Sequence, residues 1–457
     1  MDASSRGILD TIFAIGGRSQ LERIVQNGLH EKAAYMMSAK SQPLKRLERI
    51  LRIMESFDIP DYKYLVSDTN VVVQAVNYYN TRIYPMVKAS GELAPNPALI
   101  QFPLAALHML PPAVHHTVVC LSLNHFIHTL QVGTNKHVTI STRSEIHQHR
   151  GAAIRSLSQY VGKDKTRCSD LAISSILMFL AMELQNPLIA NWRSHASGLN
   201  QLIHLRGGIR SLMKQSPYLT PTLAIFMLIV TLANTCSPSR DQISLSGSPA
   251  QDLTDIESIY SILFPYTLCP PTIYLTIIRI NHLRAETSSL FPNASHFLTA
   301  HDLLSLIESF SPEDWAQPGP HFDEWMLIGR TYQSAAALYC TMALQSLTIL
   351  PSTLEMNAMR SVHGTQLLAN LHQAPKTPRL TCFVMWPLTI AGVEAGYRDA
   401  GTRYWIAARL DQLARLLGTS GPLKSLAVLR RYWENRERGW EVCFDKPQCT
   451  LVPWMGC

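Results

Sequence analysis

The sequence predicts an all-α protein, built as a large multi-helix bundle or an irregular helical array. Apolar residues recur at helical spacing from one end of the 457-residue chain to the other. Strand signals are weak, because "VVV" at 71–73 is short and no Asn-Gly or Asp-Gly turn lies between two alternating runs. With 47% hydrophobic and 16% charged residues, the chain has the composition of a folded protein with a sizeable core.

Three segments show the helical pattern most clearly. "PLKRLERILRIM" carries one apolar stripe on an otherwise charged helix, formed by Leu44, Leu47, Leu51 and Met54. "DLAISSILMFLAMELQ" at 170–185 is apolar nearly all round, which predicts a helix buried among other helices. "YWIAARLDQLARLLG" has a stripe at spacings of four and three residues, with Gly418 as the stop: Ile406, Leu410, Leu413 and Leu417.

Clusters of Pro, Gly and small polar residues predict the breaks between helices. They fall at 91–97, 110–113, 132–145, 237–252 and 374–379. The stretch 237–252 is the most loop-like, and we expect a mobile insertion there. The breaks divide the chain into an N-terminal helical portion, 1–130, and a main helical body, 150–457, which can also form one continuous unit. A regular solenoid is not predicted, since no fixed-period repeat is visible.

Charge and cysteine usage narrow the class of protein. The net charge of +7 is thinly spread and no run of five basic residues occurs, so a concentrated nucleic-acid-binding patch is not predicted. The nine cysteines form no C-x-x-C pair and most lie in apolar stretches, which predicts reduced, buried thiols in an intracellular protein. The N-terminus lacks the apolar run of a signal peptide.

Membrane spans are not predicted either. The uncharged stretches 215–239, 258–278 and 331–354 are interrupted by prolines or polar residues, so we interpret them as buried helices.

Histidine is concentrated between His108 and His149, where eight of the 17 lie. His125 and His128 are one helical turn apart, and Cys120 follows His116 by four residues. A zinc site needs three or four converging ligands, and no H-E-x-x-H or paired C-x-x-C spacing is present. Histidines scattered on helix faces are therefore the favoured interpretation, and no metal ligand is assigned.

Catalytic motifs give equally little support to an enzyme. The G-x-S-x-G elbow, the phosphate-binding G-x-x-x-x-G-K-[ST] loop and G-x-G-x-x-G are all missing from the sequence. Glu183 and Glu394 lie in apolar segments and could each act as a general base. A lone buried carboxylate more often pairs with Arg or His. The sequence therefore predicts no enzyme, and we assign no catalytic or cofactor-binding residue and no cofactor.

The C-terminal stretch "LRRYWENRERGW" at 429–440 mixes four Arg with Tyr432, Trp433 and Trp440. Such interleaving can follow a nucleic-acid strand by base stacking. The spacing of Leu429 and Trp433 also suits an amphipathic helix that packs on the body, which we favour. DNA-binding residues stay unassigned.

Two motifs carry more information. "NWRSHASGLNQLIHLRGGIRSL" at 191–212 reads as an amphipathic helix with a double-glycine stop, and its key positions are Trp192, His195, Leu199, Leu202, Ile203 and Arg206. Gly198 is expected to let another helix approach closely, and Gly207 to take the left-handed C-cap conformation. The second motif, "FVMWPLTIAGVEAGYRDAGTRYWI", contains Trp386, Pro387, Gly392, Glu394 and Arg403.

Together these motifs resemble the fungal-specific transcription factor domain, the regulatory region of zinc-cluster transcription factors, over roughly 150–440. The resemblance implies a nuclear transcriptional regulator with an α-helical body, and a packing role for Trp192, Gly198, Gly207 and Trp386. The family's zinc-cluster DNA reader needs closely spaced cysteines, whereas the first cysteine of this chain is Cys120.

The leading hypothesis is a nuclear regulator of a fungal gene set, such as a secondary-metabolite cluster. It would act through a DNA-bound protein partner, through self-association, or through a DNA-binding segment encoded upstream, and a small-molecule effector is compatible with it. The alternatives are a helical enzyme of secondary metabolism with an apolar pocket, and a ligand-binding scaffold without a role in transcription.

Overall fold

The structure is a computed structural model that describes residues 68–95, 101–130, 136–185, 192–245, 248–263, 268–288, 291–374 and 378–449. Within these ranges the regular elements are helices, which confirms the predicted all-α class. Residues Val71–Cys457 group into one compact unit. The helix predicted at 43–54 lies outside the described residues.

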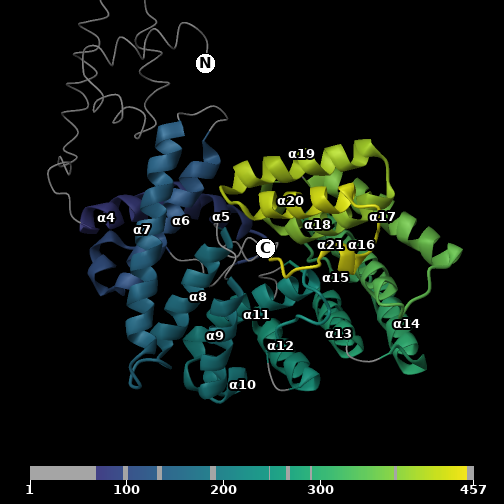
Figure 1. Cartoon of the computed structure of the whole chain (residues 1–457), viewed down its shortest axis with the longest axis horizontal. Coiled ribbons are helices and arrows are strands. Elements are labelled where there is room, and N and C mark those ends of the chain that lie inside the picture. The colour runs from purple at the N-terminus through teal and green to yellow at the C-terminus, as the bar shows by residue number, and fades with distance from the viewer. Residues whose placement is uncertain are drawn as a thin grey trace, which may run out of the picture. The chain divides into compact units, whose positions relative to one another are not determined.

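The first described helices, labelled in Figure 1, are α4 (Asp68–Tyr78), α5 (Tyr84–Ser90), α6 (Pro112–Thr129), α7 (Lys136–Val161) and α8 (Asp170–Gln185). A π-helical turn, Tyr79–Ile83, joins α4 to α5. α6 begins at a proline, as the break at 110–113 predicts, because proline suits the first turn of a helix. α6 packs against both α7 and α8.

The predicted break at 132–145 is wrong for most of its length, because α7 is helical from Lys136 onward. Its first turns are polar and rich in β-branched residues, so they show no apolar stripe. Thr142 and Ile146 are nevertheless buried, and the helix is stabilised by packing against α6 rather than by its own propensity.

The middle of the chain forms α9 (Trp192–Leu205), α10 (Gly208–Gln215), α11 (Thr220–Thr235), α12 (Pro249–Leu263) and α13 (Pro271–Thr287). Residues 236–245, the part of the segment after α11 that the structure describes, are tied to the body, whereas we expected a mobile insertion at 237–252. Asn234 exchanges two hydrogen bonds with the backbone of Ile243, both at 2.9 Å, and Ile243 and Leu245 are buried.

The C-terminal half contains α14 (Ala294–Glu308), α15 (Pro312–Trp315), α16 (Phe322–Ser346), α17 (Leu354–Gln373), α18 (Met385–Glu394), α19 (Ala400–Leu417), α20 (Gly421–Glu434) and α21 (Trp440–Cys443). α16 packs against α13, α14, α17, α18 and α21. The long buried stretch of α16, from Tyr332 to Leu344, therefore fills the centre of this half. α19 ends at Gly418 with φ +59°, which confirms the predicted stop.

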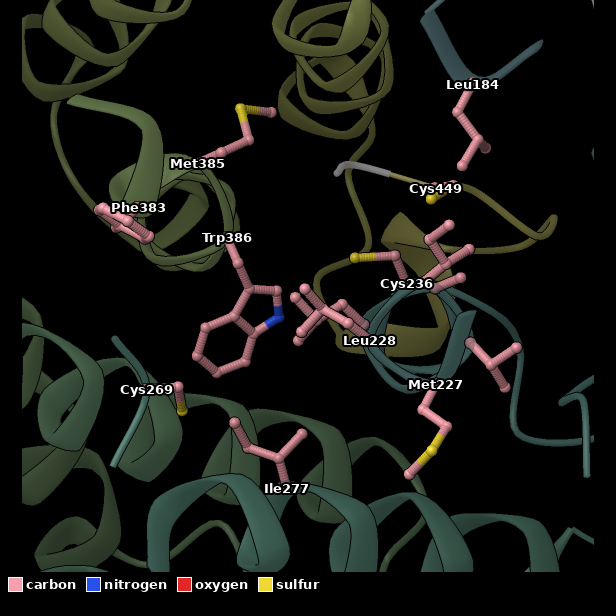
Figure 2. Packing of buried hydrophobic residues seen from close by; sticks show 14 of the residues in the cluster. Leu184, Met227, Leu228, Cys236, Cys269, Ile277, Phe383, Met385, Trp386 and Cys449 are labelled. Carbon is pink, nitrogen blue, oxygen red and sulfur yellow. The ribbon is translucent and has the colours of Figure 1, made fainter. Parts of the chain in front are cut away.

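The core is continuous across these helices. Figure 2 shows the indole of Trp386 reaching from α18 toward Leu228 of α11, with Ile277 of α13 nearby. Two segments, Pro217–Thr235 and Arg379–Tyr397, are long and apolar enough to span a membrane, but 72% and 83% of their windows are buried inside the protein. Such burial is typical of core helices.

Candidate functional site

Glu183 is the buried carboxylate at the C-terminal end of α8. Its side chain is fully buried and accepts hydrogen bonds from Arg150 of α7, from Nε at 2.6 Å and from Nη2 at 3.1 Å. The Nε2 atom of His195 lies 3.7 Å away on α9. A carboxylate at a helix C-terminus is unfavourable, so Arg150 compensates both burial and the helix dipole. The expected pairing of Glu183 with Arg or His is confirmed.

The other end of α8 is tied to α9 by a second ionic contact. Arg206 donates to Asp170 Oδ1 at 2.9 Å and to the carbonyl of Cys168 at 2.6 Å. Asp170 also accepts from Ser216 at 2.7 Å and from Tyr218. Burial raises the pKa of Asp170, but the bonds from Tyr218, Ser216 and Arg206 together hold it below its ordinary value.

The first sequence motif therefore connects two adjacent helices, α8 and α9, at both of their ends (Figure 1). His195, near the start of α9, faces Glu183 at the end of α8, and Arg206, just past α9, binds Asp170 at the start of α8. Trp192, the first residue of α9, is buried. Desolvation by burial lowers the pKa of His195, although Glu183 opposes the shift. The motif fixes the antiparallel register of α8 and α9.

The glycines of this motif have different roles from one another. Gly207 and Gly208 both have φ +85°, which confirms the left-handed stop predicted at Gly207. Gly198 does not allow a close helix approach, contrary to our expectation, because a Cβ atom there would meet no atom within 4 Å. The motif alone shows that a glycine is present but not what lies opposite it.

A close approach between two helices occurs instead at the second motif, where α18 meets α20. A Cβ atom at Gly392 would lie 2.3 Å from Cδ1 of Leu429 on α20. The carbonyl of Gly392 accepts a hydrogen bond from Trp433 Nε1 at 2.9 Å. Trp386 is buried, stacks on Tyr332, and donates to Thr235 Oγ1 at 3.0 Å. These contacts confirm the packing role of Trp386.

Glu394 and Arg403, the charged residues singled out in the second motif, each bind a residue four positions away. Glu394 accepts a hydrogen bond from Arg398 at 2.5 Å, so its expected pairing is also confirmed. Burial raises the pKa of Glu394, and Arg398 opposes that shift. Arg403 Nε donates to the carbonyl of Asp399 at 3.4 Å, and Pro387 is buried.

Arg284 forms an ionic network that our sequence reasoning missed. Its side chain is fully buried and donates to the carbonyls of Asn234 and Ser237, at 3.1 and 2.8 Å. It also donates to Tyr339 OH at 3.0 Å and to Glu441 Oε1 at 2.6 Å. The network joins α11, α13, α16 and α21. A signal was available, because Arg284 continues the buried stripe of Ile277 and Ile280.

The histidine-rich region forms pairs rather than a ligand set. His125 accepts or donates a hydrogen bond with Tyr78 OH at 2.9 Å, and His116 Nδ1 lies 2.9 Å from His149 Nδ1. The thiol of Cys120 donates to the carbonyl of Ile146 at 3.4 Å. Among the described residues, no three His, Cys, Asp or Glu side chains are grouped to hold a metal ion.

The C-terminal aromatic residues are packed. Tyr432 and Trp440 are buried, and Trp440 Nε1 donates to the carbonyl of Thr235 at 2.8 Å. Arg431 binds Asp445 at 2.5 Å, and Arg438 donates to the carbonyl of Gly396 at 2.9 Å. Buried rings cannot stack on bases, so the packing interpretation of 429–440 is confirmed, although α20 ends at Glu434 and a separate turn begins at Trp440.

Residues 68–455 match the family described as fungal specific transcription factor domain. The match contains both motifs and every described helix. The chain belongs to this family. The resemblance expected from the two motifs is thereby confirmed, and the family region begins earlier than the expected residue 150.

One relative is the phomenoic acid biosynthesis cluster-specific transcriptional regulator of Leptosphaeria maculans, which is 33% identical over 344 residues. The similarity covers 74% of this chain and 66% of that relative, slightly under two thirds of its length. No solved structure matches the chain.

Proposed function

We propose that this chain regulates the transcription of a group of fungal genes that serve one biosynthetic pathway. Membership of the fungal specific transcription factor domain family supports a role in transcription. The relative from Leptosphaeria maculans is named as a regulator specific to one biosynthesis cluster, which supports a similarly restricted gene set here.

The proposed role is non-enzymatic. The charged side chains in and next to the two motifs are paired within the body: Glu183 with Arg150, Asp170 with Arg206, and Glu394 with Arg398. A catalytic carboxylate or histidine must face a reacting group. The pairing of these residues within the body supports a structural role for both motifs, and is the observation that favours regulation over catalysis.

We further propose that contact with DNA is made by a DNA-bound protein partner or by a segment outside the described residues. The packed aromatic residues of 429–440 support this division, because Tyr432 and Trp440 are buried and Arg431 is paired with Asp445. A nuclear location is proposed from the family alone. The division into an N-terminal portion, 1–130, and a main body, 150–457, which can also form one continuous unit, stays a prediction.

Chromatin occupancy of the tagged full chain tests this proposal in a fungal host. Crosslinking and sequencing should place the chain at a small set of promoters, with an unfused tag as the control. Enrichment that persists after nuclease digestion of bridging RNA but is lost on deletion of a partner gene would assign the DNA contact to that partner. Uniform background over all promoters would contradict a regulatory role.

A further inference from the structure

The turn after α7 lies against the junction of α9 with α10 (Figure 1). One hydrogen-bonded cluster joins them. Arg206 donates to the carbonyl of Cys168 at 2.6 Å and to Asp170 Oδ1 at 2.9 Å. It also donates to Gln215 Oε1 at 3.1 Å, and Asp170 accepts a hydrogen bond from Tyr218. Residues that flank these positions in the sequence therefore lie close to one another in space.

Exposed apolar side chains surround this cluster. Leu205 immediately precedes Arg206 and is 64% exposed, and Tyr218 is 69% exposed. Leu171, immediately after Asp170, is 47% exposed. A single exposed leucine is ordinary on a protein surface, whereas several large apolar side chains around one point mark a contact surface.

Exposed lysines accompany these apolar residues. Lys163 and Lys165 lie in the turn after α7, where the backbone N–H of Arg167 donates to the carbonyl of Lys163 at 2.9 Å. Lys214 lies in the last turn of α10. Among the described residues, no carboxylate lies within 4.0 Å of the ammonium group of any of these three lysines. Their charges are therefore available to an anionic partner.

The balance of charge at this surface is positive. Residues 161–171 and 204–218 contain six Lys and Arg residues against two Asp residues. Both aspartates already have an arginine partner, at 3.2 and 2.9 Å, and Arg210 is paired with Asp255 of α12 at 2.5 Å. The three lysines therefore carry the unbalanced charge. Complementary charge favours an acidic partner, and like charge disfavours a second copy of the same surface.

The apolar residues favour a protein over a nucleic acid as that partner. Phosphates of a nucleic acid would pair with the lysines, but its backbone offers Leu171 and Leu205 no apolar contact. The lysines also come from two separate segments, and neither segment contains a continuous basic run. A peptide that interleaves carboxylates with apolar side chains satisfies both halves of the surface.

We propose that this surface binds an acidic peptide segment whose carboxylates alternate with apolar side chains. We name it the lysine–leucine surface, and it consists of three basic and three apolar residues: Lys163, Lys165, Lys214, Leu171, Leu205 and Tyr218. The peptide's apolar side chains pack on the leucines and the tyrosine, and its carboxylates pair with the lysines. Such a segment belongs to the protein partner of the regulator, an assignment that rests on the proposed function.

Fluorescence anisotropy with the purified full chain tests the lysine–leucine surface. The probe is a labelled helical peptide with leucine on one face and glutamate elsewhere. Two control peptides carry glutamine in place of glutamate, or serine in place of leucine. The acidic peptide should bind, and each control peptide should bind at least about tenfold more weakly. Absence of binding by the acidic peptide, or equal binding by the glutamine peptide, would overturn the proposal.

Matched variants locate the binding on the chain. Leu205→Ser should weaken binding of the acidic peptide about tenfold, as expected for an apolar anchor. Leu298→Ser, at a 62% exposed position of α14, should leave binding unchanged. Changing the three lysines of the surface to Gln should also weaken binding about tenfold. The same change at exposed Lys88, Arg430 and Lys446 alters the net charge equally and should have little effect. Equal losses within either matched pair would place the binding elsewhere and overturn the proposal.

Duplex DNA is the competing ligand. If DNA binds in place of the peptide, and the lysine variant loses this binding while Leu205→Ser retains it, the surface contacts nucleic acid and the proposal is wrong.

Transcripts in a fungal host separate this inference from the proposed function. A strain carrying Leu205→Ser together with the lysine changes should reproduce the transcript changes of a deletion strain, with the chain present at its parental level. Parental transcripts in this strain, alongside altered transcripts in the deletion strain, would overturn the role of the surface and leave the proposed function standing. Unchanged transcripts in the deletion strain would instead contradict the proposed function.

Discussion

Arg284 and Glu441 are 157 residues apart in the sequence, and their side chains meet at 2.6 Å. Arg284 is fully buried, and its guanidinium also donates hydrogen bonds to backbone carbonyls at and just after the C-terminal end of α11. Glu441 additionally accepts a hydrogen bond from the backbone of Ser239 at 2.9 Å. The pair therefore ties the last helical turn, α21, to the loop after α11.

Replacing Glu441 by Gln should destabilise the protein strongly. The buried guanidinium of Arg284 would lose its compensating charge, which typically costs about 3–5 kcal/mol. Urea unfolding of the variant and the parent measures the difference in the free energy of unfolding. Glu437→Gln, at an exposed position four residues earlier, is the matched control. Similar small losses in both variants would show that the ion pair does not anchor α21.

Two glycine-to-alanine changes should have opposite effects. Gly392→Ala places a methyl group against Leu429, and such overpacking costs about 1–3 kcal/mol. Gly198→Ala meets no atom within 4 Å and should stabilise α9 by about 0.5–1 kcal/mol, because alanine is the better helix former. Thermal unfolding of both proteins provides the comparison. A loss of stability in Gly198→Ala would contradict the open space next to Gly198.

The turn between α9 and α10 should depend on Gly207. At φ +85°, an alanine costs about 1–2 kcal/mol, and its Cβ atom would lie 3.0 Å from Ser211 Oγ. Gly151→Ala in the middle of α7 is the control, since its nearest neighbour is the flexible end of Arg155 at 3.5 Å. Unchanged unfolding temperature in Gly207→Ala would contradict the left-handed turn.

His125 and His128 should make the stability depend on pH. Burial lowers the pKa of each to about 4, from an ordinary value of 6.5. Between these values the unfolded chain binds more protons, so this contribution is complete above pH 6.5 and is lost as the pH falls toward 4. The slope approaches about 1.4 kcal/mol per pH unit for each histidine.

The measurement is the free energy of unfolding of the parent and of a variant carrying His125→Gln and His128→Gln, at several pH values in this window. The variant should show a shallower dependence on pH, whatever its stability at neutral pH. His147→Gln, on the exposed face of α7, should leave the slope unchanged. Parallel curves for the double variant and the parent would show that neither histidine is buried in its neutral form.

Local patterns predicted those parts of the fold whose signals are themselves local. The apolar stripe and glycine of 404–418 predicted both α19 and its end, because spacing and a left-handed stop are properties of one segment. The uniformly apolar 170–185 predicted burial, and the pairing of Glu183 followed from the cost of an isolated charge in such a helix.

Features that depend on contacts between distant segments could not be predicted from the sequence. α7 begins inside a predicted break because its helix is stabilised by α6, which the segment's own residues do not reveal. The roles of Gly198 and Gly392 depend on what lies opposite each of them. The role of Arg284 depends on Glu441, which lies 157 residues further along the chain.

Transcript profiling tests the central claim, transcriptional regulation of one pathway, most directly. A strain lacking this gene, its parent, and the deletion strain complemented with the full chain are compared under conditions that induce secondary metabolism. We predict that a compact set of genes, including neighbours of this locus, changes together on deletion and recovers on complementation. Unchanged transcripts accompanied by loss of a metabolite would contradict a regulatory role and point to an activity in the pathway itself.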